Sequence, residues 1–210
     1  MYVSRLNIKE NKSKFIALTA VFAGLFALGN FIAIPGVASI EMIVTFVCAG
    51  LFGPEIAIIS SLAGEAIVMP IAPPSESLFI YSTFIGDAIA ALVMGYGRRI
   101  AFPMEKTFKM EPRKARVFGE SIAYIFMLAS RYSFYILFDA IVLYSGLLID
   151  PDGISVAMVA YVGVHMLRFV LKAIFLPLCI LIAETIRKNM GKVYFDLEKV
   201  EIADVAKSGA

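Results

Sequence analysis

Residues 15–36 read FIALTAVFAGLFALGNFIAIPG, an apolar run without a charged side chain that ends at the helix-breaking pair Pro35-Gly36. An α-helix needs about 20 such residues to cross the hydrocarbon core of a bilayer. The preceding segment, Met1 to Lys14, is polar, and no small-residue cleavage site follows the run, so we expect a retained membrane span rather than a signal peptide. Apolar residues make up 60% of the chain, which excludes an ordinary soluble domain.

Five further apolar segments follow, and the sequence therefore predicts an all-α membrane protein with six transmembrane helices. The second and third segments are short and are separated only by Gly53-Pro54, so they need not cross the bilayer as ideal helices. The fifth is too long for an upright span, which indicates a tilt or an interfacial start. The expected spans are residues 15–34, 37–52, 55–72, 78–97, a stretch within 117–149, and 155–186; the transmembrane domain is 15–190, between cytoplasmic segments 1–14 and 191–210.

Basic residues outside these segments all fall on one side of the six-span layout. Sixteen of the nineteen lysines and arginines lie before the first span, between the fourth and fifth spans, or after the sixth, whereas the connections near residues 35, 73–77 and 150–153 carry none. The positive-inside rule then places both termini in the cytoplasm of a multi-pass plasma-membrane protein. The basic 98–116 loop is either a topological anchor or a surface for docking a partner.

The other three basic residues lie inside apolar segments, where an ionisable group is costly unless it faces a partner or a cavity. They are Arg131, Arg168 and Lys172, and the acids at similar positions are Glu41, Glu65, Asp87 and Asp139. At 1.5 Å of rise per residue, Asp87, Asp139 and the single histidine, His165, each lie about 14 Å below the outer end of their span, and Glu65 lies slightly shallower. By contrast, Glu55, Glu120 and Glu184 lie near cytoplasmic ends and are expected to be in contact with water.

These polar groups also form stripes along the helices. Tyr161, His165, Arg168 and Lys172 share one face of the sixth span, and Arg131, Tyr135 and Asp139 follow a slowly drifting stripe on the fifth. Aromatic rings interleaved with donors and acceptors suit a flat, polar heterocycle. The alternative is a set of structural ion bridges, which is most plausible for the deepest residues, Arg131 and Lys172. The predicted substrate-binding residues are Glu65, Asp87, Arg131, Tyr135, Asp139, Tyr161, His165, Arg168 and Lys172.

Catalytic and metal-binding motifs are missing from the sequence. One histidine cannot supply an HExxH metal pair, and there is neither a GxSxG nucleophile elbow nor a phosphate-binding P-loop. Cys48 and Cys179 lie within apolar runs and read as small buried side chains rather than metal or disulfide partners. We therefore expect no enzyme, no cofactor, no metal and no nucleic-acid partner.

Small residues gather on one face of the first span, in its cytoplasmic half. Ala17, Ala20, Ala23, Gly24 and Ala27 lie within about 100° of one another around the helix. Small side chains let a second helix approach closely in lipid. This face packs either within the protein's own bundle or against a partner.

The length, the six spans with cytoplasmic termini and the opening stretch at 15–36 resemble the substrate-binding S-components of energy-coupling factor (ECF) vitamin transporters. The resemblance also rests on the AxxxA step from Ala23 to Ala27 and on the continuation IEMIVTFVCAGLFGPEIAIISSLAGEAI, with its short spans joined by Gly53-Pro54. It covers roughly residues 15–190. The chain has no tryptophan, which several members of that family use to stack on their ligand, so tyrosine or phenylalanine would have to serve.

The resemblance implies a subunit that binds a vitamin or related micronutrient from outside and delivers it by docking on a membrane T-component with two ABC ATPases. The docking residues would be Ala20, Ala23, Gly24 and Ala27, and bulky changes at Ala23 or Ala27 would leave ligand binding intact. Two alternatives remain open: a membrane scaffold of the cell-shape morphogenesis type, and a stand-alone secondary transporter, although no internal duplication is visible. The near balance of buried cations and acids leaves the charge of the ligand undetermined.

Overall fold

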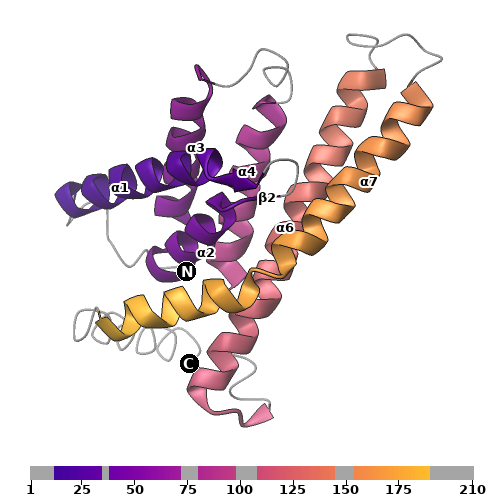
Figure 1. Cartoon of the computed structure of the whole chain (residues 1–210). Coiled ribbons are helices and arrows are strands. Elements are labelled where there is room, and N and C mark those ends of the chain that lie inside the picture. Colours follow the sequence, from indigo (N-terminus) through magenta and orange to yellow (C-terminus); the bar gives the residue numbers. More distant parts are fainter. Residues whose placement is uncertain (1–11, 35–37, 72–79, 98–107, 145–153, 190–210) are drawn as a thin grey trace, which may run out of the picture.

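A computed structural model describes residues 12–34, 38–71, 80–97, 108–144 and 154–189, and these form a helical fold with one very short strand ribbon (Figure 1). Of the expected cytoplasmic segments 1–14 and 191–210, residues 1–11 and 191–210 lie outside the described residues, and so do the predicted outer loops, whereas residues 12–14 belong to the first helix. The elements are α1 (Lys12–Phe31), β1 (Ala33–Ile34), β2 (Ala38–Ser39), α2 (Glu41–Phe52), α3 (Pro54–Val68), α4 (Ile80–Gly97), α6 (Pro112–Tyr144), α7 (Ile154–Ala173) and a last helix, Leu176–Asn189.

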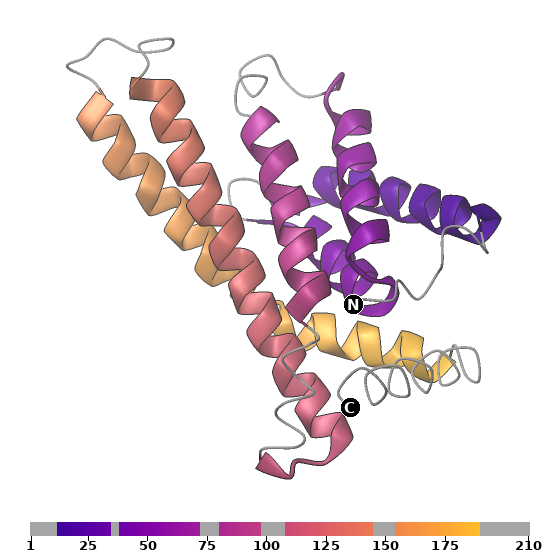
Figure 2. The ribbon, with the colours of Figure 1, turned by 180° about the vertical axis from the view of Figure 1, so that it is seen from behind.

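The helices pack in two connected groups. In one, α3 lies between α1 and α4; in the other, α6 lies between α4 and α7, and α2 fills the space beside α1, α3 and α4. Both views show α6 and α7 running side by side, with α4 beside α6 and α1 crosswise to α4 (Figures 1 and 2). The last helix is inclined to α7 by 42°. The antiparallel ribbon pairs Ala33 with Ser39 and joins α1 to α2. Helix α2 therefore begins deep inside the bundle.

The junction of α2 and α3 follows from the Gly53-Pro54 pair. Gly53 adopts a φ of 97°, which glycine reaches without steric cost, and its N–H donates to the Ala49 carbonyl at 3.1 Å. Pro54 then takes the first position of α3, where a missing N–H costs nothing. The two helices contain 12 and 15 residues. Their lengths are about 18 and 22 Å, less than the hydrocarbon core of about 30 Å.

Glycines on α4 allow close contact with its neighbours. A Cβ atom on Gly95 would lie 2.6 Å from the Pro54 Cα, and one on Gly97 would lie 2.1 Å from the Ala123 Cβ. Neither position has room for a side chain, so α4 contacts both the start of α3 and the middle of α6 at backbone distance. This packing brings Asp87, the single acid of α4, against α6.

The helical class predicted from the sequence is confirmed, but the lengths of the helices differ from six ideal spans. Among the described residues, Lys12–Phe31 and Pro112–Ile141 are each long and apolar enough to cross a membrane. A third span results if Tyr161–Ala173 and Leu176–Asn189, which are bent by 42° relative to each other, count as one. Shorter apolar helices cover Glu41–Phe52 and Ser82–Gly97. These features are compatible with a membrane protein.

The expected span over residues 155–186 is not one continuous helix, because the helix breaks after Ala173 and resumes at Leu176 with a bend of 42°. Pro177 has no N–H to donate to the preceding turn, and its ring disfavours a regular helix there. The Lys172 carbonyl accepts hydrogen bonds from the Phe175 N–H at 3.1 Å and from the Tyr124 hydroxyl at 2.7 Å. Tyr124 of α6 thus donates a hydrogen bond to a backbone carbonyl that lacks its regular intrahelical partner at the break.

A second correction concerns Glu120, which was expected to be in contact with water and is instead fully buried. Its carboxylate accepts a hydrogen bond from Arg187 Nη1 at 3.0 Å, and Arg187 also donates to Glu184 at 2.6 Å. Because Glu120 belongs to α6 and Arg187 to the last helix, this pair fastens the two helices together. A count along the chain shows where a residue lies along its helix but not which neighbouring helix covers it.

Candidate functional site

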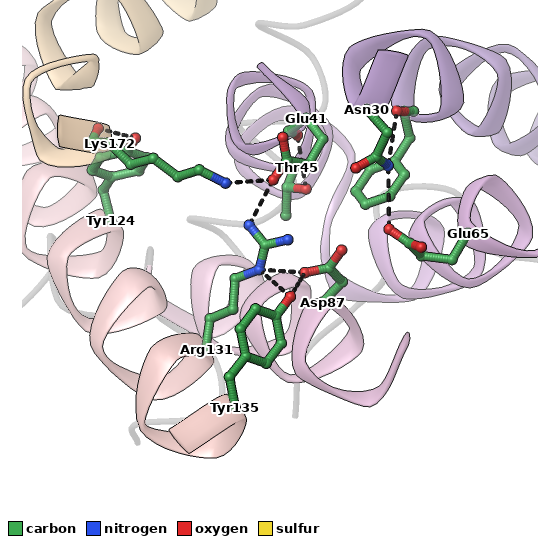
Figure 3. Close-up of polar contacts among 10 residues, drawn as sticks. Asn30, Glu41, Thr45, Glu65, Asp87, Tyr124, Arg131, Tyr135 and Lys172 are labelled. Carbon is green, nitrogen blue, oxygen red and sulfur yellow. Dashed lines mark hydrogen bonds and ion pairs between the residues drawn. The ribbon is translucent and has the colours of Figure 1, made fainter. Parts of the chain in front are cut away.

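The candidate site begins with an ion network centred on Glu41, the first residue of α2 (Figure 3). One carboxylate oxygen of Glu41 accepts from Lys172 Nζ at 2.5 Å and from Arg131 Nη1 at 2.8 Å. All three side chains are buried. The N-terminus of a helix favours an anion, so the position of Glu41 adds to its stabilisation by the two cations.

The same arginine joins α6 to α4. Arg131 Nε forms an ion pair with Asp87 and donates to the Tyr135 hydroxyl at 2.6 Å, and that hydroxyl donates onward to Asp87 at 2.8 Å. Arg131 and Tyr135 are four residues apart, so both reach the same point on α4. A Cβ atom on Gly86 would lie 2.1 Å from the Tyr135 ring, and the glycine therefore makes room for the tyrosine.

The third acid of this region, Glu65 of α3, lies beside Asp87 (Figure 3). Its carboxylate accepts a hydrogen bond from the Asn30 amide at 3.2 Å, and only 5% of the residue is exposed. We call the whole set the central network, and it comprises Glu41, Glu65, Asp87, Arg131, Tyr135 and Lys172.

A second polar group lies between α6 and α7, and we call it the α6–α7 cluster: Tyr132, Asp139, Tyr161 and His165. The Tyr161 hydroxyl donates to Asp139 Oδ2. The His165 ring lies 4.3 Å from the Tyr161 ring and 5.7 Å from the Tyr132 ring, measured between centroids. It also lies 5.9 Å from the Tyr135 ring, which connects the cluster to the central network.

The α6–α7 cluster holds several buried polar atoms without a hydrogen-bond partner among the described residues. They are Asp139 Oδ1, His165 Nδ1 and the Tyr132 hydroxyl. The residues themselves are 1, 5 and 3% exposed, respectively. More than 90% of buried polar groups in native proteins have a partner, so these three atoms on two facing helices require a partner beyond the described protein atoms, such as water or a bound molecule.

The structure distributes eight of the nine predicted substrate-binding residues over two places. Five of them, Glu65, Asp87, Arg131, Tyr135 and Lys172, belong to the central network, where ion pairs and hydrogen bonds engage them. Asp139, Tyr161 and His165 belong to the α6–α7 cluster. Arg168 is half-buried on α7, one turn beyond His165.

Two residues of the site were not among those predicted. Glu41 was recognised as a buried acid, but nothing in a linear count of residues shows that α2 begins between Arg131 and Lys172. Tyr132 lies seven residues before Asp139, on the same face of α6, so the helical spacing could have indicated it.

The predicted docking residues divide between the inside and the outside of the bundle. Ala23 and Ala27 are 4 and 5% exposed and pack towards α3, where a Cβ atom on Gly64 would lie 3.0 Å from the Ala23 carbonyl. Ala20 is exposed, and a Cβ atom on Gly24 would meet no atom within 4 Å. Only Ala20 and Gly24 remain available to a partner.

Comparison of this chain with protein-family models, with curated proteins and with solved structures gives no match.

Proposed function

We propose that this chain is the substrate-binding membrane subunit of an ECF-type importer, which takes up a vitamin-like micronutrient from outside. In this proposal α1, α6 and the bent pair formed by α7 and the last helix cross the membrane, and the shorter helices α2, α3 and α4 complete six spans. The one-sided distribution of basic residues supports this topology. The subunit itself would be no enzyme and would carry no cofactor, because it lacks a P-loop and leaves ATP hydrolysis to its partners.

The observation that carries the proposal is the set of buried polar atoms between α6 and α7 that lack a hydrogen-bond partner. In the central network, Glu41 Oε2 and Asp87 Oδ2 also lack one, but both of these carboxylates form ion pairs with Arg131. For Asp139 of the α6–α7 cluster, no ion pair is found among the described residues. Leaving such a group unsatisfied costs about 1–3 kcal/mol. A ligand that satisfies them would recover this free energy, and this gives the cluster a reason to bind one.

The experiment is native mass spectrometry of the detergent-purified subunit. We expect the parent protein to retain a small molecule. The Asp139→Ala variant should retain none, and its mass should equal that of the chain without ligand. The matched control is Glu184→Ala, which removes an acid at the cytoplasmic end and should leave the ligand in place. A parent protein that holds no small molecule, even after growth in rich medium, would contradict the proposal.

The central network on its own fits a second function, that of a membrane scaffold. Ion bridges between α2, α4, α6 and α7 are what a rigid bundle without a ligand would need. A scaffold would show the same melting temperature whether purified from rich or minimal medium. The proposed importer subunit would melt at a higher temperature when it carries its ligand.

Topology can be tested with single cysteines. Replacing Ser75 or Asp152 with cysteine should create a thiol that an impermeant reagent labels from outside in intact cells. Lys109→Cys should be labelled only after the cells are opened, because the basic loop is cytoplasmic in the proposed layout. The native Cys48 and Cys179 are buried and give a low background. Labelling of position 109 in intact cells would overturn the topology.

A further inference from the structure

We infer that the α6–α7 cluster binds a cationic nitrogen, either a protonated amine or a charged nitrogen heterocycle. This inference rests on the proposed function, since it concerns the ligand of that same site. The central network and the α6–α7 cluster share one low-dielectric interior, and their charges decide which ligand the site accepts.

The first argument is that the buried cations of the central network already have acidic partners. Arg131 forms ion pairs with Glu41 and Asp87, and Lys172 forms one with Glu41. A buried carboxylate is expensive unless its charge is compensated, and a ligand that brings one positive charge would compensate Asp139.

The second argument is the surroundings of the Asp139 carboxylate. Glu41 and Asp87 both have ion pairs with Arg131, but among the described residues no ion pair is found for Asp139. Its carboxylate receives hydroxyl donors, Tyr161 and Ser82, and its Oδ1 atom still has no hydrogen-bond partner. A buried carboxylate with an oxygen that lacks a partner can accept a hydrogen bond from a charged N–H group. Such a bond is stronger than one from a neutral donor.

The third argument is the group of tyrosine rings around His165. The rings of Tyr132, Tyr135 and Tyr161 all lie within 6 Å of the His165 ring, centroid to centroid. Tyrosine faces attract cations, and the same rings already do so on the side of the central network. Arg131 Cζ lies 5.1 Å from the Tyr135 centroid, and Lys172 Nζ lies 6.0 Å from that of Tyr132. These two cations are neutralised by their own acids and do not compete for Asp139.

Three probes of the same shape test the inference: benzylamine, benzyl alcohol and benzoate share one ring and differ in charge. Each is added to the full-length subunit, freed of retained ligand, and the melting temperature is followed. We expect benzylamine to raise it, at a concentration at least ten-fold lower than benzyl alcohol needs, and benzoate to have no effect. Loss of a buried charged partner typically lowers affinity by about thirty-fold or more, and this is the loss expected for Asp139→Asn.

Two variants guard against a folding artefact. Arg113→Gln changes a side chain that is 71% exposed and lies outside the α6–α7 cluster, and it should retain the preference for benzylamine. Glu184→Gln should behave as the parent does. Equal or stronger binding of benzoate would overturn the inference. So would a retained natural ligand that proves neutral or anionic, although the proposed function would then stand. If the subunit retains no ligand and no probe changes its melting, both the inference and the proposed function fail.

Discussion

Replacing Arg131 with alanine is expected to lower the free energy of unfolding by about 3–5 kcal/mol, the typical cost of removing one partner from a buried ion pair. The reason is that Arg131 serves two acids, since it contacts both Glu41 and Asp87, and each is 1% exposed or less. Its loss also removes the donor to the Tyr135 hydroxyl. Thermal unfolding in detergent can be followed with a thiol-reactive dye, because Cys48 and Cys179 are free and buried until the protein unfolds.

Arg113 provides the matched control. It forms an ion pair with Glu184 at 3.4 Å, but its side chain is 71% exposed. Exposed pairs contribute less than about 1 kcal/mol, so Arg113→Ala should leave the melting temperature nearly unchanged. The double change Arg131→Ala with Asp87→Asn should recover part of the loss, because Asp87 is the acid left without a cation, whereas Glu41 keeps its ion pair with Lys172. Equal melting of the Arg131 and Arg113 variants would show that the central network does not stabilise the fold.

The sequence was sufficient to predict the helical class and the burial of Glu41, Glu65, Asp87, Arg131, Asp139 and Lys172, but not that of Glu120. A span free of charges predicts α1, the spacing of Arg131 and Tyr135 predicts one face of α6, and Gly53-Pro54 predicts the end of α2. Each of these depends on neighbours along the chain. The same reasoning placed Asp139 and His165 at one level from their depth, and it placed Tyr161 on the face of His165 from the helical spacing.

What the sequence could not supply is the lateral arrangement of the helices. Depth along a span placed Asp87 and Asp139 at the same level, but depth does not show that Asp87 meets Arg131 while Asp139 meets Tyr161. Those contacts depend on how far α4 approaches α6, and the glycines at 86 and 97 set that distance. The break after Ala173 is different in kind, since Pro177 was visible in the sequence and indicates a break by itself.

The face of small residues on α1 is another case in which the sequence does not show which neighbouring helix covers a residue. Ala20→Trp should leave the isolated subunit folded, with the melting temperature and retained ligand of the parent, because Ala20 is exposed. Uptake should fall to background when the variant is expressed with its energising partners, since an indole at this position keeps a partner helix from approaching. Substrate accumulation in whole cells measures uptake, and native mass spectrometry measures retention.

Ala23→Trp, three residues further along α1, should behave differently. Ala23 is 4% exposed and packs where α1 meets Gly64 of α3. Overpacking a buried site costs about 1–3 kcal/mol or more, so this variant should melt earlier and lose its ligand as well as uptake. The sequence alone predicted intact ligand binding for this change, and the buried position of Ala23 reverses that expectation. Normal uptake with Ala20→Trp would place the docking surface elsewhere, and normal melting with Ala23→Trp would contradict the packing of α1 on α3.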